Sequence, residues 1–315
     1  MRKILLLIPF FFISHYTQAQ YKWDVGGSLG AANYLGDIGG GIHTRRDFVL
    51  DMKMGETRTA AGAFARRKLG PKISLQIGFD YAHIQGDDKL SANPERQHRN
   101  LNFQNNIYEL NVMGQYFFYE INDLGGSYRY RNDFRAYAGI GVAGFHHNPK
   151  TLDSNIPLAP MMNEGHAYSL YQFAIPAQLG FYITIDKRYR IGWDLTWRTT
   201  FTDYLDDVST NYINPATKSK SDPQYANFLY YNNRTPELNN VSAADAAAYG
   251  YHTYVDSKGG THVNKRGDPS HNDSYMTSTI NFSYTLRGKS TFYKSNYGSI
   301  FKSKKHKKRK FRAKF

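Results

Sequence analysis

Four histidines, His83, His98, His146 and His147, lie in loops or near the ends of segments in which apolar and polar residues alternate. Hydrolysis through a serine needs a hydroxyl, an imidazole and an orienting acid held together, and a zinc site needs a third ligand beside two neighbouring histidines. None of the four histidines lies in a motif whose spacing supplies these partners. We therefore predict a protein that is not an enzyme, with no catalytic residue, metal or cofactor.

Three closely spaced aspartates, Asp203, Asp206 and Asp207, form a second group with chemical potential. Carboxylate oxygens are the ligands that calcium prefers, but the spacing does not match the twelve-residue calcium loop of helix–loop–helix proteins. In the alternative interpretation, the carboxylates accept backbone N–H hydrogen bonds or pair with arginines such as Arg96 and Arg99. We favour this second interpretation, in which the aspartates organise the base of a loop.

The N-terminal residues have the pattern of a secretory signal peptide. Arg2 and Lys3 precede an apolar run over residues 4–13, and small residues follow at 17–19. A run of about ten apolar residues is too short to span a membrane, which takes roughly 20 residues in a helix. We expect residues 1–19 to be removed. The chain contains no cysteine, which excludes disulfides, thiolate metal sites and a lipid anchor on cysteine.

The net charge of +14 is concentrated at the C-terminus. Residues 287–315 hold twelve lysines and arginines and no acid, and the signal region holds two more, so the body of the chain is neutral. Such a tail is disordered in isolation. Because the chain is exported, we exclude nucleic acid and expect anionic lipid, peptidoglycan or an acidic protein surface as the partner. The predicted partner-binding residues are Lys304, Lys305, Lys307, Lys308, Arg309, Lys310 and Arg312.

Strict alternation of apolar and polar residues predicts β-strands along the body of the chain. Four segments alternate cleanly, at 21–34, 72–81, 191–198 and 279–286, and four weaker ones lie at 59–67, 107–119, 134–145 and 171–185. Pro176 interrupts the last of these, and because proline cannot donate to a ladder we expect a bulge or distortion there. Eight strands are an even number, as bacterial outer-membrane barrels have.

The two faces of these strands indicate which environment each meets. Phe79, Trp193, Trp197 and Phe282 share a face opposite polar or charged residues. A soluble barrel or sandwich, the rival fold, would place the apolar face inside. We therefore predict an all-β fold, an eight-stranded antiparallel transmembrane β-barrel of OmpA-like size, over residues 20–286.

The connectors between the predicted strands alternate in length. Short turns lie at 67–71 and 186–190, whereas long loops lie at 36–58, 86–105, 146–169 and 204–273. Short turns belong in the periplasm and long loops outside the cell, which places both termini and the basic tail in the periplasm. The connector at 120–133 is longer than a usual periplasmic turn.

Charged residues on the polar face are expected inside the barrel. An eight-stranded barrel is just wide enough for side chains to fill it. Buried charges must be paired, so we favour a charge-paired plug over an ion or proton pathway, which argues against a general porin. The predicted acids are Asp24, Asp80, Glu109 and Asp194, and their predicted partners are Lys22, Lys72, Arg135 and Arg198.

Four segments of the chain carry local motifs. The longest are IQGDDKLSANPERQHRNLNF at 84–103 and TFTDYLDDVSTNY at 200–212, with GAANYLGD at 30–37 and AIPAQLG at 174–180. These segments resemble the PorG family of outer-membrane proteins from the Bacteroidetes type IX secretion system. The resemblance spans about 21–286. It implies a small barrel that associates, through its periplasmic side, with a ring of the PorK lipoprotein and PorN. The residues that match its motifs, and that we expect to form a structural cluster at the loop base, are Asp87, Asp88, Arg99, Asn100, Asp203, Tyr204, Asp206 and Asp207.

Three hypotheses of function follow. In the first, the barrel sits in outer-membrane lipid as a non-enzymatic component of the secretion system, and residues 287–315 contact the periplasmic ring or peptidoglycan. In the second, it is a small barrel with a structural, small-molecule transport or receptor role, which single-channel conductance would reveal. The third, an outer-membrane hydrolase, would require a function for His83 or His98.

Overall fold

The computed structural model describes residues 21–39, 54–122, 124, 132–214, 217–234, 237, 253–255, 259 and 261–287. The predicted signal peptide at 1–19 lies outside these ranges. So do residues 288–315, with every predicted partner-binding residue of the tail.

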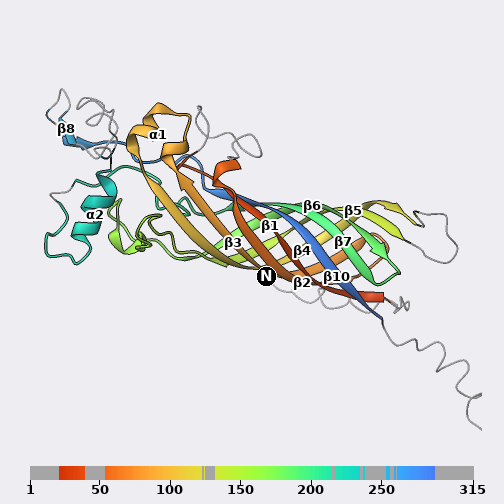
Figure 1. The fold of residues 1–315 in the computed structure, drawn as a ribbon. Coiled ribbons are helices and arrows are strands. Elements are labelled where there is room, and N and C mark those ends of the chain that lie inside the picture. Colours follow the sequence, from red (N-terminus) through yellow and green to blue (C-terminus); the bar gives the residue numbers. More distant parts are fainter. Residues whose placement is uncertain are drawn as a thin grey trace, which may run out of the picture.

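Eight antiparallel strands close into a barrel in the order β1-β10-β7-β6-β5-β4-β3-β2 (Figure 1). They are β1 (Tyr21–Leu35), β2 (Arg58–Lys68), β3 (Ile73–Asp87), β4 (Asn102–Ile121), β5 (Asp133–His146), β6 (Tyr171–Ile185), β7 (Tyr189–Thr200) and β10 (Ser274–Arg287). The first strand pairs with the last along its whole length, from Tyr21↔Arg287 to Leu35↔Ser274. The predicted eight-stranded barrel is therefore confirmed.

All eight predicted segments correspond to strands, and the largest differences lie at one end of the barrel. β3 continues to Asp87 and β4 begins at Asn102, beyond the residues in which alternation is visible. There both faces are covered, and the period of two fades from the burial pattern. Pairing between β5 and β6 is interrupted opposite Pro176 without a change of register, so the ladder is distorted there but has no bulge.

The barrel has an apolar outer surface and a polar interior. Along β6 every second residue from Ala174 to Thr184 is buried, and the residues between them are exposed. The outward residues include Leu179 of β6, Ile191 of β7 and Phe282 of β10, each about half exposed, whereas inward polar residues such as Asn111 are buried. This inverted arrangement is that of an outer-membrane barrel, and strands of 11 to 20 residues reach the 9–11 residues that a bilayer requires.

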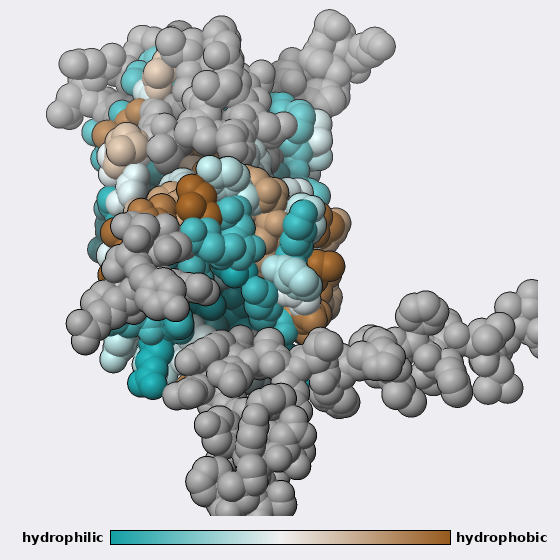
Figure 2. Space-filling view, turned by 90° about the vertical axis from the view of Figure 1, so that its right-hand side faces the viewer, coloured by the Kyte–Doolittle hydropathy of each residue, from teal (hydrophilic) through white to brown (hydrophobic). Residues whose placement is uncertain are grey.

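The two ends of the barrel differ in their connectors. At the short-turn end the connectors are 69–72, 122–132 and 186–188, and at the other end they are 36–57, 88–101, 147–170 and 201–273. We call the described residues of the four long connectors the loop cap. Figure 2 views the short-turn end, where polar residues gather in the middle with apolar residues on both flanks.

The loop cap contains the remaining elements, which lie at one end of the barrel in Figure 1. They are η3 (Met54–Glu56), η4 (Asp88–Leu90), α1 (Pro94–Arg99), η5 (Ala159–Met161), α2 (Tyr225–Asn232), β8 (Thr253–Val255) and β9 (Thr261–Val263). One apolar cluster joins the cap to the barrel rim, with Ile38, Phe103, Leu205 and Phe228 among its buried members. In the part of the chain that the structure describes, no helix is both long and apolar enough to cross a membrane.

Candidate functional site

The residues predicted to form a loop base occupy two neighbouring parts of the loop cap. Asp87, Asp88, Arg99 and Asn100 flank η4 and α1, and the aspartates of 203–207 follow β7. The two parts meet because Arg99 donates to the carbonyl oxygens of Asp37 (2.8 Å) and of Arg266. Arg266 in turn binds Asp207, so the structure connects Asp88 and Arg99 with the loop that carries Asp206 and Asp207.

Asp88 and Arg99 form the centre of the first part. Arg99 donates to both carboxylate oxygens of Asp88, from Nε (2.8 Å) and Nη2 (2.9 Å). The same carboxylate accepts from the backbone N–H of Gly39 (3.0 Å) and of Leu101 (3.1 Å). A buried ion pair is stable only when its remaining lone pairs and N–H groups are satisfied in this way, so this pair ties three separate backbone segments together.

Asp87 and Asn100 define the ends of the short helices in this part. Asp87 accepts from the N–H of Lys89 (2.9 Å) as the N-cap of η4. Asn100 ends α1 in the left-handed region, at φ +57°, which asparagine adopts more readily than most residues. Its side chain donates to the carbonyl of Arg234 (2.9 Å). Both residues therefore shape the backbone.

Asp206 anchors the second part through Tyr34 at the barrel rim. The Tyr34 hydroxyl lies 2.6 Å from Asp206 Oδ2 and 2.8 Å from Asp273 Oδ1, and it accepts from the N–H of Asp37 (3.0 Å). A phenol has one hydrogen, so it can donate to only one of the two carboxyls, and the other contact requires a proton on the acid. Burial raises the pKa of both acids, and neighbouring carboxylates raise it further.

Asp207 and Glu164 share the buried guanidinium of Arg266. The Nη2 atom lies 2.9 Å from Asp207 Oδ2 and Nη1 lies 3.0 Å from Glu164 Oε1. Glu164 also accepts from the N–H groups of Ser209 (2.8 Å) and Thr210 (2.9 Å). Burial alone would raise the pKa of Glu164, but Arg266 and these N–H groups hold it below its ordinary value. For Asp207, burial outweighs Arg266 and raises the pKa.

Asp203 and Tyr204 lie beside this network. Burial, together with the nearby carboxylates of Asp37 and Asp206, raises the pKa of Asp203 to about 8. The Tyr204 ring stacks on Tyr168 with 4.6 Å between the ring centres. Its hydroxyl contacts Glu164 (3.4 Å) and hydrogen-bonds to the imidazole of His166.

The contacts of the aspartates match a loop base more closely than a metal site. Among the residues that the structure describes, no three His, Cys, Asp or Glu side chains gather in a way that could hold a metal ion. The predicted pairing with Arg96 is wrong, because Arg96 binds the carbonyl of Gly39. Arg99 pairs with Asp88, and of the three aspartates Asp207 forms an ion pair, with Arg266.

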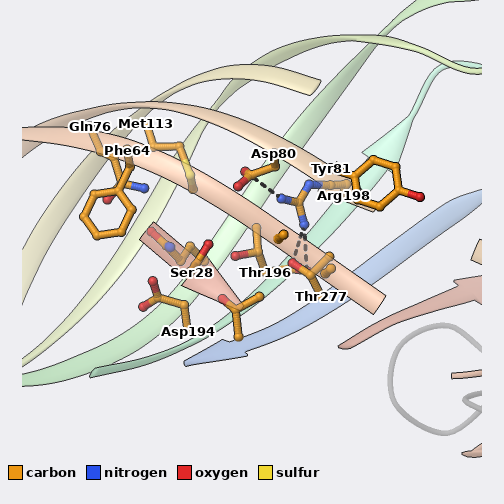
Figure 3. Close-up of a pocket in the computed structure, with 14 residues that line it drawn as sticks. Ser28, Phe64, Gln76, Asp80, Tyr81, Met113, Asp194, Thr196, Arg198 and Thr277 are labelled. Atoms are coloured by element: carbon orange, nitrogen blue, oxygen red, sulfur yellow. Dashed lines mark hydrogen bonds and ion pairs between the residues drawn. The ribbon is translucent and has the colours of Figure 1, made fainter. Parts of the chain in front are cut away.

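A second network fills the barrel. Its upper half, which is the half nearer the loop cap, centres on Arg198 (Figure 3). Arg198 lies 2.6 Å from Glu109 Oε2 and 3.2 Å from Asp80 Oδ2, and it donates to Thr277 (2.7 Å). Asn111 donates to both carboxylates, at 2.7 Å in each case. The predicted role of Arg198 as a partner of the lumenal acids is confirmed.

The lower half of the lumen centres on Asp24 and Asp194. Asp24 pairs with Arg190 (2.8 Å) and Arg66 (3.5 Å). Asp194 accepts hydrogen bonds from Tyr137 and from Asn281 (2.8 Å). Ion pairs and hydrogen bonds between these side chains therefore offset much of the cost of burying charge in the lumen.

The predicted lysine partners are not those that the structure uses. Lys72 precedes β3, which begins at Ile73, and its side chain is exposed at the short-turn end. The Lys22 side chain lies outside the described residues. Arg135 pairs with Glu120, which was not predicted. Between the two lumenal layers lies a cavity of about 30 Å³, lined by Gln76, Asp80, Thr196 and other residues, with room for a water molecule or two (Figure 3).

The histidines do not converge on one site. His83 contacts Asn106 (2.7 Å) on the outer face, and His98 binds the carbonyl of Pro94 (2.6 Å) within α1. His146 packs on Tyr171, with 4.8 Å between the ring centres. His147 is buried against Phe145, and burial lowers its pKa to about 4.

Sequence reasoning missed the cations and acids that complete both networks. Arg66 lies on the inward parity of a predicted strand, so the alternation could have identified it. Asp37 ends the segment 30–37, which the sequence analysis singled out without naming this residue. Glu164 and Arg266 lie in long loops without periodicity, and no sequence signal pairs them across about a hundred residues.

Comparisons with known proteins give a family and likenesses of fold. A family model described as a domain of unknown function (DUF6089) matches residues 2–232. A search of curated proteins gives no match. Among solved structures, the chain is similar to Ail of Yersinia pestis, with 7% identity over 84% of this chain and 99% of that chain and a TM-score of 0.34. It is also similar to OprG of Pseudomonas aeruginosa, with 10% identity over 85% of this chain and 97% of that chain and a TM-score of 0.37. Because the family match covers more than half of its length, the chain belongs to the family described as a domain of unknown function (DUF6089).

Proposed function

We propose that this protein is a non-enzymatic outer-membrane component of a type IX protein secretion system, of the PorG kind, which anchors a periplasmic ring of PorK and PorN. The short-turn end then faces the periplasm, with both termini, and the loop cap faces outward. This orientation follows the usual placement of short turns and long loops in outer-membrane barrels.

The observation that carries the proposal is the absence of an open path through the described barrel. Arg198 with its two acids fills the upper lumen, Arg66 and Asp24 fill the lower lumen, and the cavity between them holds about 30 Å³. A barrel that conducts solutes keeps a water-filled channel. A barrel filled in this way suits a rigid membrane anchor.

The positions of the motif residues support the same interpretation. The segments that resemble the PorG family supply Asp88, Arg99, Asp206 and Asp207, and all four are buried. The side chains of the first three hydrogen-bond to backbone groups, and Asp207 accepts from the side chain of Asn163. Their contacts hold the loops on the barrel. Residues of this kind shape the fold of the loop cap and have no catalytic role in this proposal.

The test is affinity purification of the tagged protein from outer membranes in mild detergent, followed by mass spectrometry. Recovery of PorK and PorN supports the proposal, whereas a barrel recovered alone contradicts it. The same purification with residues 288–315 deleted tests the tail. If the deletion removes the ring proteins from the purified sample, the tail binds the ring. If it removes co-purifying peptidoglycan fragments, the tail binds the cell wall.

The second candidate is a small-molecule transport or receptor role, for which the supporting feature is the polar lining of the lumenal cavity, including Gln76, Asp80 and Thr196. Conductance steps in planar bilayers would support this role. Silent bilayers would favour the anchor.

A further inference from the structure

The short-turn end of the barrel carries an excess of positive charge. Its described side chains include eight cations and four carboxylates. The cations are Arg66, Arg67, Lys68, Lys72, Arg135, Lys187, Arg188 and Arg190, and the carboxylates are Asp24, Glu120, Asp133 and Asp186. The body of the chain is neutral as a whole, so this excess is a local property of one end.

Four of these cations face the mouth of the barrel. Arg66 and Arg190 share Asp24, and Arg135 pairs with Glu120. Lys68 interacts electrostatically with Arg135, Glu120, Arg190 and Asp133, and it has no carboxylate within ion-pair distance in the described part of the chain. Lys68, Arg66 and Arg190 line one small cavity of about 10 Å³ with Asp24. The mouth therefore gathers more positive charge than its own acids balance.

Two of the guanidinium groups present N–H groups without partners. The buried Nη1 atom of Arg135 and the buried Nε atom of Arg190 have no hydrogen-bond partner among the described residues. A buried donor left without a partner is destabilising. Aromatic rings hold these groups in place, with Arg190 4.7 Å from the ring centre of Tyr182 and Arg135 5.8 Å from that of Phe117. The two guanidinium groups are therefore held in place at the mouth before any ligand arrives.

We propose that this mouth, formed by Lys68, Arg135 and Arg190, is a docking site for a carboxylate-rich segment of a periplasmic protein. The proposal rests on the proposed function, because it places the short-turn end in the periplasm. A guanidinium matches the geometry of a carboxylate, and a glutamate or aspartate on a flexible segment can reach inward-facing side chains. A lipid headgroup in the surrounding leaflet lies outside the barrel wall and cannot.

The chain's own neighbouring segments do not have the composition of the occupant. Residues 288–315 contain eleven lysines and arginines and no acid. Residues 123–131 contain one acid, Asp123, and two arginines. Self-occupation would add like charge to the mouth, so the complementary charge must come from another molecule.

The test measures binding of a fluorescent ten-residue glutamate peptide to the full chain in zwitterionic nanodiscs. Lys68→Gln with Arg135→Gln removes two mouth cations. The matched control, Arg67→Gln with Lys72→Gln, removes two exposed cations from the same end, and the basic tail is present in every protein. We expect the mouth variant to bind the peptide roughly tenfold or more weakly, and the control to remain within about twofold of wild type.

Equal weakening in both variants would overturn the proposal, because binding would then follow the general field of this end. If short-chain phosphatidylglycerol, and not the peptide, distinguishes the two variants, the occupant is a lipid and the proposal is also overturned. Lys68→Gln alone serves if the double variant fails to fold, since Lys68 leaves no acid unpaired. The peptide measurement needs no secretion protein. If the mouth variant alone loses peptide binding but the purification recovers no ring proteins, the proposed function is rejected and the docking site for an acidic segment still stands.

Discussion

Replacing Arg266 by methionine should release the loop cap from a barrel that stays folded. Arg266 is fully buried, and its removal leaves Glu164 and Asp207 facing each other without their shared cation. Removing one partner of a buried ion pair costs roughly 3–5 kcal/mol. At about 1.4 kcal/mol for each factor of ten, the open population of the cap should rise by about two to three and a half orders of magnitude.

Hydrogen exchange reads this population directly, because amides protected by the cap exchange only when it opens. The reporter is the peptide over 203–212, whose amides donate to cap carboxylates, for example Val208 N to Asp206 (2.8 Å) and Ser209 N to Glu164 (2.8 Å). Amides of β6 and β7 should keep their protection, since Arg266 lies outside the barrel strands.

Lys265→Met is the matched control for this experiment. It removes the same charge from the neighbouring residue, but Lys265 is exposed and lies 3.5 Å from a partly exposed Asp268. An exposed pair of this kind contributes little, so exchange should stay within about threefold of wild type. If Arg266→Met exchanged like Lys265→Met, the loop base would not hold the cap and our reasoning would be refuted. The effect of Arg266→Met should shrink at low pH, where Glu164 and Asp207 become neutral.

Three further predictions concern the cap, the lumen and conduction. Burial raises the pKa of Asp203 to about 8, so between about pH 4 and 8 the folded cap binds a proton that the open cap releases. Protection of the amides of 203–212 from hydrogen exchange should therefore fall as the pH rises from 4 to 8. Constant or rising protection, corrected for intrinsic exchange, would contradict this. Arg198→Met leaves Glu109 and Asp80 without a cation in the lumen and should lower barrel stability by roughly 3–5 kcal/mol. The measurement is the temperature at which the folded barrel shifts its mobility in a gel, which should be lower in this variant and unchanged in Arg67→Met, whose side chain faces outward. Wild-type protein should give no conductance steps in planar bilayers, and regular open-channel steps would contradict the filled lumen.

Alternation along the chain was enough to predict the barrel. Segments such as 279–286 place large apolar residues on one parity and polar residues on the other, which a barrel with a polar interior and an apolar outer face accommodates. The ends of the strands were less accessible to this reasoning. The Asn102 end of β4 is covered by the loop cap on both faces, so tertiary packing replaces the period of two that a bilayer imposes.

The networks were predictable only where a periodic pattern or a local motif carried them. The inward parity assigned Asp24 and Arg198 to the lumen, but Lys72 was assigned there wrongly because it precedes the first paired residue of β3. The loop-base aspartates could be singled out by their spacing. Their partners Glu164 and Arg266 are brought in by long loops, and loop closure over such separations leaves no local trace in sequence.

Site-specific photo-crosslinking in living cells tests the central claim most directly. A crosslinking residue at Lys187, which is exposed at the short-turn end, or at Asn155, which is exposed in the loop cap, reports which proteins touch each end of the barrel. We predict crosslinks from position 187 to a periplasmic ring protein, PorK or PorN, and none to these proteins from position 155. Ring crosslinks from position 155, or none from position 187 in cells that secrete normally, would contradict an anchor whose short-turn end faces the periplasmic ring.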